Sequence, residues 1–197
     1  MIVMENKILS EKESLDLITQ MIRETQQNTA RYAAYPLLIW GYTTAIISIL
    51  IWLGISVFNL GYQIQYFWFA LPVIALPLTF YYLRKDSRKG SKNYMERITG
   101  EVWMVMGIGG GVLGVIAFFQ SFNILFVVSI LMAMATTLSG LIMKFKPLTV
   151  CGIVTMCISL VLLFVHSMDC LLIFAAIFIV MMVIPGHIFN KKQKESC

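Results

Sequence analysis

The sequence has few charged residues for its length. Only 13% of its 197 residues are Asp, Glu, Lys or Arg, whereas 59% are apolar, and the mean hydropathy is +0.82. Soluble domains carry about 25% charged and about 45–50% apolar residues, so these charged side chains are too few to cover a water-soluble globule. The scarcity of charge therefore excludes a soluble fold and predicts a membrane protein.

Motifs that carry enzyme chemistry are also missing. The four cysteines form no CxxC pair and have no histidine cluster nearby, which argues against a zinc site, a thioredoxin-like motif and a structural disulfide. HExxH, GxSxG and Walker A motifs are absent. We therefore expect a non-enzymatic protein without a cofactor or a metal. Residues 1–35 are polar apart from Met1 to Met4, so we also expect no cleavable signal peptide.

Six apolar stretches are long enough to cross a bilayer as helices, which takes roughly 17–25 residues. None of them contains Lys, Arg, Asp or Glu. The pattern predicts an all-α, polytopic transmembrane helical bundle with six spans in three hairpins. Its parts are a cytoplasmic segment 1–35, a transmembrane domain 36–189 and a basic cytoplasmic tail 190–197. The expected spans are residues 36–58, 66–83, 102–119, 123–143, 149–166 and 170–189.

The Lys and Arg residues predict the orientation of these spans. With the N-terminus inside, all 15 lie in cytoplasmic segments, and the only charge in the outer turns is Asp169. Short loops rich in Lys and Arg remain in the cytoplasm, so we expect both termini there. The net charge of +5 then reflects orientation in the membrane and not binding to nucleic acid.

The loop 84–101 holds a basic cluster beside two of the spans. Such a cluster attracts anionic lipid headgroups by about 1 kcal/mol for each basic residue near the surface. Topology alone also explains the cluster. The expected headgroup-binding residues are Arg84, Lys85, Arg88, Lys89 and Lys92.

The third span is rich in glycine, and part of it formally matches a dinucleotide-binding fingerprint. That fingerprint requires a preceding strand and an acidic residue about 20 positions later, and an apolar span provides neither. Small residues on the fourth span, among them Thr136 and Gly140, predict tight packing of spans three and four. The sequence leaves open whether the glycine face also joins two copies of the chain. The glycines form two overlapping GxxxG pairs, which let another backbone come close: Gly107 with Gly111, and Gly110 with Gly114.

Ionisable residues inside a span often mark ion pathways, and this chain has none near a span centre. His166 and His187 lie near span ends, where both can reach water. Hydroxyl groups inside the spans can bond to carbonyls of their own helix. Alternatively, Thr136, Thr137 and Ser139 would line a path for a neutral solute.

Residues 10–29 predict an amphipathic cytoplasmic helix ahead of the first span. Ser10 and Glu13 have the spacing of a capping box, and apolar residues then recur at helical intervals from Leu15 to Ile22. The charges of this stretch sum to minus two, whereas a helix that lies on anionic lipid is rich in Lys and Arg. We expect it to pack on the inner loops of the bundle or on a partner protein.

Four stretches of the chain are packing and boundary signatures: Ser10–Ser14, Ile39–Tyr42, Thr136–Pro147 and Pro185–His187. On these stretches the chain resembles a group of uncharacterised small six-span bacterial inner-membrane proteins that have no assigned activity. The resemblance implies a fold and a location in the inner membrane, and it transfers no activity.

A non-enzymatic regulatory or scaffolding membrane component fits these features best. It would contact anionic headgroups at the cytoplasmic face and bind a protein partner through residues 10–29. The alternative is a small transporter or channel for a neutral or hydrophobic solute, packed as a homo-oligomer through Gly107 to Gly114.

Overall fold

The computed structural model describes residues 11–87, 94–117, 119–165 and 167–195. Within these ranges the chain is helical and contains no strand. The six predicted spans are confirmed as helices that are long and apolar enough to cross a membrane, although the third begins eight residues earlier than expected. Their bounds are Ala34–Ser56, Gln63–Arg84, Tyr94–Ile116, Ile124–Ile142, Lys146–Leu163 and Cys170–Lys191.

Seven α-helices build these spans within the described ranges: α1 Glu11–Ser56, α2 Ala70–Ser87, α3 Tyr94–Ile116, α4 Ile124–Ile142, α5 Lys146–Ser159, α6 Cys170–Phe178 and α7 Ile184–Glu195. Short turns of other helix types complete three of the spans. A 3-10 helix, η1 Tyr62–Phe69, precedes α2, and another, η2 Leu160–Leu163, follows α5. A π-helix, η3 Ile179–Val183, joins α6 to α7. We call α6, η3 and α7 together the final span.

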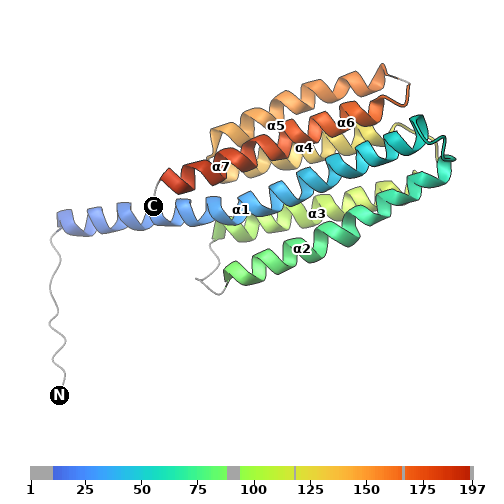
Figure 1. Ribbon diagram of the computed structural model, residues 1–197. Helices are drawn as coiled ribbons and strands as arrows, with labels where there is room; N and C mark the ends of the chain where they lie inside the picture. The colour runs from blue at the N-terminus through green and yellow to red at the C-terminus, as the bar shows by residue number, and fades with distance from the viewer. Residues whose placement is uncertain (1–10, 88–93, 118, 166, 196–197) are drawn as a thin grey trace.

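The first helix combines the polar N-terminal stretch and the first span in one element. α1 runs without interruption from Glu11 to Ser56 and contains Pro36, so the boundary predicted between residues 35 and 36 does not break the helix. At 1.5 Å per residue, residues 11–33 are about 35 Å long. Figure 1 shows that this part of α1 extends beyond the other helices.

The final span is the centre of the bundle and α2 and α3 are its periphery. Of the final span 56% is buried, against 6% of the spans that contain α2 and α3. α1 contacts α2, α3 and the final span, and α4 contacts α3, α5 and α6. Figure 1 accordingly shows α1 between α2 and α3 on one side and the remaining helices on the other. Among the described residues α2 and α3 do not contact each other.

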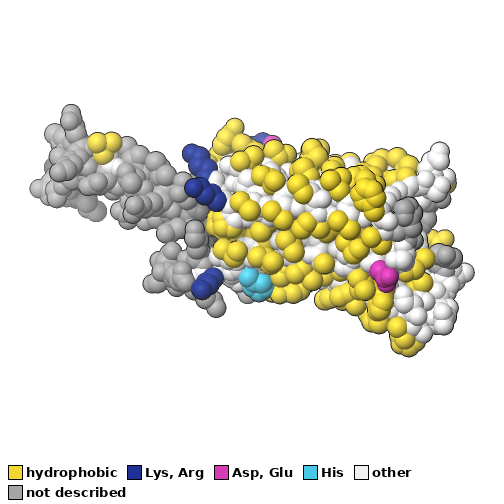
Figure 2. Space-filling model, turned by 90° about the horizontal axis from the view of Figure 1, so that it is seen from above, with side chains coloured by type: hydrophobic (Ala, Val, Ile, Leu, Met, Phe, Trp, Pro, Cys, Tyr) yellow, Lys and Arg dark blue, Asp and Glu magenta, His cyan; other side chains and the backbone are white. Residues whose placement is uncertain are grey.

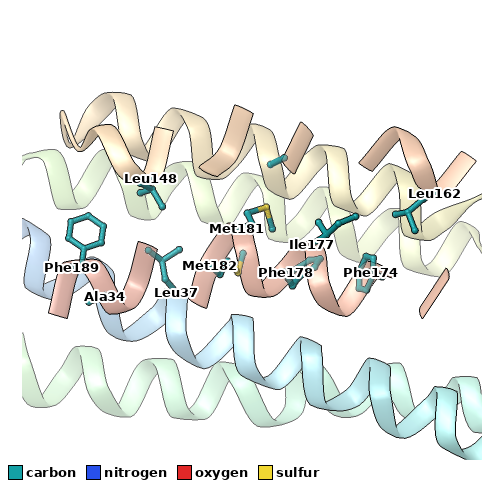
Figure 3. Packing of buried hydrophobic residues seen from close by; sticks show 11 residues of the cluster. Ala34, Leu37, Leu148, Leu162, Phe174, Ile177, Phe178, Met181, Met182 and Phe189 are labelled. Atoms are coloured by element: carbon teal, nitrogen blue, oxygen red, sulfur yellow. The ribbon is translucent and has the colours of Figure 1, made fainter. Parts of the chain in front are cut away.

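The main apolar core surrounds the final span. Its members come from α1, α5, η2 and the final span, together with Ala133 of α4. Figure 3 shows side chains of the final span lying between those of α1 and those of the fifth span. The labelled residues are Ala34, Leu37, Leu148, Leu162, Phe174, Ile177, Phe178, Met181, Met182 and Phe189.

Two glycines allow α1 and the final span to cross closely. A Cβ atom added to Gly41 would lie 2.9 Å from both Met182 Cβ and Val183 Cγ2. A Cβ atom added to Gly186 would lie 2.8 Å from Leu38 Cδ2. Each helix therefore contributes a glycine where the other helix presses against it, as small residues do at helix contacts in membranes.

A second pair of glycines lies between α4 and α5. A Cβ atom on Gly140 would lie 2.5 Å from the backbone nitrogen of Thr149, and one on Gly152 would lie 2.8 Å from that of Thr137. These distances are backbone contacts, which rotating a side chain cannot relieve. α4 and α5 therefore approach each other closely, although they belong to different hairpins in the predicted arrangement.

The π-helical turn η3 lies directly before a proline. Pro185 has no N–H group and cannot donate to the carbonyl four residues earlier, at Met181. The N–H of Ile184 bonds to the carbonyl of Ile179, five residues back, which is the wider spacing of a π-helix. The turn thus keeps its donors paired inside the apolar region, where water is absent.

The crossing at Gly41 predicts a strong dependence of stability on this position. We expect Gly41→Leu to lower the free energy of unfolding by about 1–3 kcal/mol, because the added side chain overpacks the contact with η3. The matched control is Gly111→Leu, since a Cβ atom there has nothing within 4 Å. The measurement is thermal unfolding in detergent, and equal melting temperatures for the two variants would contradict the close crossing.

Candidate functional site

The two ends of the bundle differ in charge. Figure 2 shows Lys and Arg side chains gathered at one end of the apolar surface, which we call the basic end. Asp169 lies in the turn before α6, at the opposite end. The exposed basic residues whose side chains are described at the basic end are Arg84, Arg97, Lys144, Lys146 and Lys191. The described structure therefore separates the charges as the sequence pattern does.

Of the five predicted headgroup-binding residues, only Arg84 has a described side chain. Arg84 is exposed near the end of α2, where the span reaches the basic end. The side chains of Lys85, Arg88, Lys89 and Lys92 lie outside the described residues. Arg97 forms an exposed ion pair with Glu101, with 3.0 Å between Nε and Oε1, so the start of α3 carries compensated charge. The headgroup site remains a prediction.

The glycines of α3 do not form the tight helix contact that was expected of them. A Cβ atom on Gly107, Gly111 or Gly114 would have no described atom within 4 Å. A Cβ atom on Gly110 would make ordinary contact with Met132 of α4, at 3.6 Å. α3 does pack on α4, but three of its glycines lie on a flank that no described part of the chain covers.

The small residues of α4 pack against α5 and not against the glycines of α3. Gly140 is buried against Thr149, and Gly152 of α5 is in turn close to Thr137. Thr136 is fully buried, and its hydroxyl donates to the carbonyl of Met132 at 2.9 Å. The sequence identified a close-packing surface on α4, but the helix that covers it could not be inferred from a pattern of small residues.

Most hydroxyl groups inside the bundle bond to their own helix. Ser139 donates to the carbonyl of Ala135 at 2.8 Å, and Thr155 donates to that of Cys151 at 2.7 Å. Thr137 likewise donates to Ala133 at 2.8 Å. The hydroxyls of Thr44, Thr99 and Ser129 are buried without a partner among the described residues. A hydroxyl that donates to a carbonyl of its own helix has its donor satisfied there, which leaves fewer groups for a polar path.

Two long-range polar contacts join helices at the end of the bundle opposite the basic end. Sequence reasoning predicted neither of them. The indole Nε1 of Trp52 donates to Asp169 Oδ1 at 3.2 Å, and Ser167 donates to the other carboxylate oxygen at 3.1 Å. Asn123 donates to the carbonyl of Leu162 at 2.7 Å while its side-chain oxygen caps α4. A signal did exist for the first contact, because Asp169 is the single charge in the predicted outer turns.

A third contact joins α1 to α7 close to the basic end. The hydroxyl of Tyr42 lies 2.7 Å from Nε2 of His187, and the two rings meet edge to face. Both side chains are exposed. The sequence predicted that His187 reaches water, while His166 lies outside the described residues.

Within the described ranges no three His, Cys, Asp or Glu residues gather in a way that could hold a metal ion. The polar groups that the described structure brings together are of two kinds. Some form hydrogen bonds between helices, and the others carry the charge at the two ends of the bundle. Comparison with protein-family models, curated proteins and solved structures found no match to the chain.

The Trp52–Asp169 contact predicts a measurable energetic coupling. We expect Trp52→Phe to lower the free energy of unfolding by about 1 kcal/mol, because it removes this hydrogen bond, and Asp169→Ala to lower it somewhat more, because it also removes the hydrogen bond from Ser167. The double variant should lose little more than Asp169→Ala alone, whereas Asp169→Asn keeps an acceptor and serves as the control. Chemical denaturation in detergent measures these values, and strictly additive losses would show that the two residues do not interact.

Proposed function

We propose that this protein is a non-enzymatic regulatory or scaffolding component of the bacterial inner membrane, with both termini in the cytoplasm. The separation of charge between the two ends of the bundle supports this orientation, because Lys and Arg accumulate in short cytoplasmic loops. The resemblance on four packing and boundary stretches supports the location. In this arrangement the basic end meets the anionic headgroups of the inner leaflet.

The observation that carries the proposal is the continuity of α1. The same helix crosses the membrane from Ala34 to Ser56 and extends about 35 Å beyond it. Within the bundle α1 packs on the final span, which is the most buried of the spans. We call residues 11–33 the projecting part of α1. A protein that binds the projecting part is then held by a rigid element anchored in the core.

The composition of the projecting part favours a protein partner. Residues 11–24 carry more acidic than basic residues, whereas helices that lie on anionic membranes are rich in Lys and Arg. A net negative helix that continues the axis of a span points away from the bilayer surface. We therefore place the partner site on residues 10–29.

Transport of a neutral or hydrophobic solute is the alternative, in a homo-oligomer joined through α3. The uncovered flank at Gly107, Gly111 and Gly114 leaves room for a second copy. The hydroxyls of Thr136, Thr137 and Ser139, which would line the path, instead donate to their own helix. The scaffold therefore has the better support.

Removal of the projecting part should abolish partner capture. We expect crosslinked pull-downs with the full chain to recover proteins that are missing when residues 1–29 are deleted, because the deletion leaves all six spans intact. Deletion of residues 192–197 is the matched control, since it shortens the chain at the same end of the bundle and also leaves the span Cys170–Lys191 intact. Identical partner sets for the full chain and the 1–29 deletion would count against the scaffold.

The proposed orientation is testable with reporter fusions. Alkaline phosphatase inserted in the turn 59–65 or 167–169 should be active, because these turns face away from the cytoplasm, and the same reporter in the loop 88–93 should be inactive. A fluorescent protein fused after residue 197 should fluoresce, as it does when it folds in the cytoplasm. Active phosphatase in the loop 88–93 would contradict the proposed orientation.

A further inference from the structure

We propose that Asp169, at the end of the bundle opposite the basic end, binds the ammonium group of phosphatidylethanolamine. Trp52 and Ser167 hold its carboxylate in place, and the apolar surface of α1 and the final span receives the acyl chains. The site does not depend on a protein partner. It rests on the proposed function in one respect only: with both termini in the cytoplasm, the bound lipid belongs to the outer leaflet.

Two donors from different parts of the chain fix the position of the carboxylate. The indole Nε1 of Trp52 on α1 lies 3.2 Å from Oδ1 of Asp169, and the hydroxyl of Ser167 lies 3.1 Å from Oδ2. An ionised carboxylate has about four lone-pair sites on its two oxygens, so both oxygens can accept a further hydrogen bond. Asp169 is exposed, and a ligand can therefore reach these sites from outside the bundle.

The negative charge of Asp169 has no basic partner at this end of the bundle. The sequence contains neither Lys nor Arg in residues 32–83, 98–143 and 147–190, and these ranges include the outer turns. A histidine side chain is mainly neutral at pH 7, so His166 in the same turn adds little positive charge. An uncompensated carboxylate beside a bilayer attracts a cationic group.

Phosphatidylethanolamine provides a cation that fits this carboxylate. Its ammonium group has one positive charge and three N–H donors, as the side chain of lysine does. Hydrogen bonds between such donors and a carboxylate are roughly twice as strong as those between neutral groups. The trimethylammonium group of phosphatidylcholine has the same charge but no N–H donor, and phosphatidylglycerol has only a negative charge. The site should therefore prefer phosphatidylethanolamine over both.

The surface beside Asp169 suits the acyl chains of a lipid. On α1, which packs on α6, Ile49 lies one turn before Trp52 and is 39% exposed, and Ile46 is 55% exposed. On the final span, Ile179 is 38% exposed. Figure 2 shows an acidic side chain at the margin of the apolar surface, at the end away from the Lys and Arg side chains. A free amine gains nothing from that surface, which is why we assign the site to a lipid.

Native mass spectrometry of the purified full chain at neutral pH tests the site with phosphatidylethanolamine, phosphatidylcholine and phosphatidylglycerol of the same acyl chains. Asp169→Asn removes the charge and keeps an acceptor for Trp52. We expect it to weaken phosphatidylethanolamine binding about fivefold, the upper end for an exposed ion pair. Phosphatidylcholine should bind the unmodified chain about threefold more weakly than phosphatidylethanolamine, for want of a hydrogen bond. Phosphatidylglycerol binding should not fall in the variant, because a like charge has been removed.

Glu101→Gln is the matched control, because it removes an exposed carboxylate from the start of α3, where Arg97 pairs with it. It should leave phosphatidylethanolamine binding as in the unmodified chain. Melting temperatures within the error of the unmodified chain show that both variants are folded.

Three results would overturn the site. Unchanged phosphatidylethanolamine binding by Asp169→Asn would show that the carboxylate does not hold the headgroup, and equal losses for Asp169→Asn and Glu101→Gln would indicate diffuse surface charge. Binding of free phosphoethanolamine as tight as that of the lipid would contradict the assignment to a lipid. Binding in detergent does not depend on orientation in a membrane, so failure of this site is distinguishable from failure of the proposed function.

Discussion

The close crossing of α1 and the final span is the contact on which the rest of the bundle depends. Gly41 and Gly186 lie where the partner helix presses against each of them, and neither position has room for a Cβ atom. This contact buries one side of the final span, and the fifth span covers another through Leu148 and Leu162. Apolar side chains gain little by leaving lipid, so the close approach of small residues has to supply the attraction through packing. The helices without such a crossing, α2 and α3, are accordingly the least buried.

A second constraint is that the bilayer interior provides no water for backbone groups. The final span departs from α-helical spacing at η3, and the N–H of Ile184 finds the carbonyl of Ile179 there. At η2 the helix also changes type, and the side chain of Asn123 reaches the carbonyl of Leu162 from the start of α4. One asparagine therefore satisfies the irregular end of one span and caps the next in space. These local irregularities are tolerated because their polar groups are paired within the protein.

The spans and the separation of charge were predictable because both are local properties of the sequence. A helix needs only a sufficient apolar length, and charges near its ends need no knowledge of neighbours. The choice of helix partners was not predictable in the same way. Gly107 and Gly140 both belong to small-residue patterns, yet the first is uncovered and the second is pressed against Thr149. The contact between Trp52 and Asp169 joins residues 117 positions apart. The change from polar to apolar residues at position 36 predicted a boundary, although the helix continues through it.

The packing of α1 favours the scaffolding form of the proposed function over the regulatory form. A regulatory switch needs two arrangements of the same elements, each stabilised by its own ligand. α1 is held on one side by Gly41 against η3, at its far end by Trp52 on Asp169, and beside the basic end by Tyr42 on His187. Sliding or rotating the helix would break these three contacts together and would bring atoms of α1 and η3 into steric overlap at Gly41. A helix fixed in this way keeps one position in the bundle and does not relay a movement. In the proposed scaffold, the projecting part of α1 would then hold a partner at a set distance from the end of the bundle.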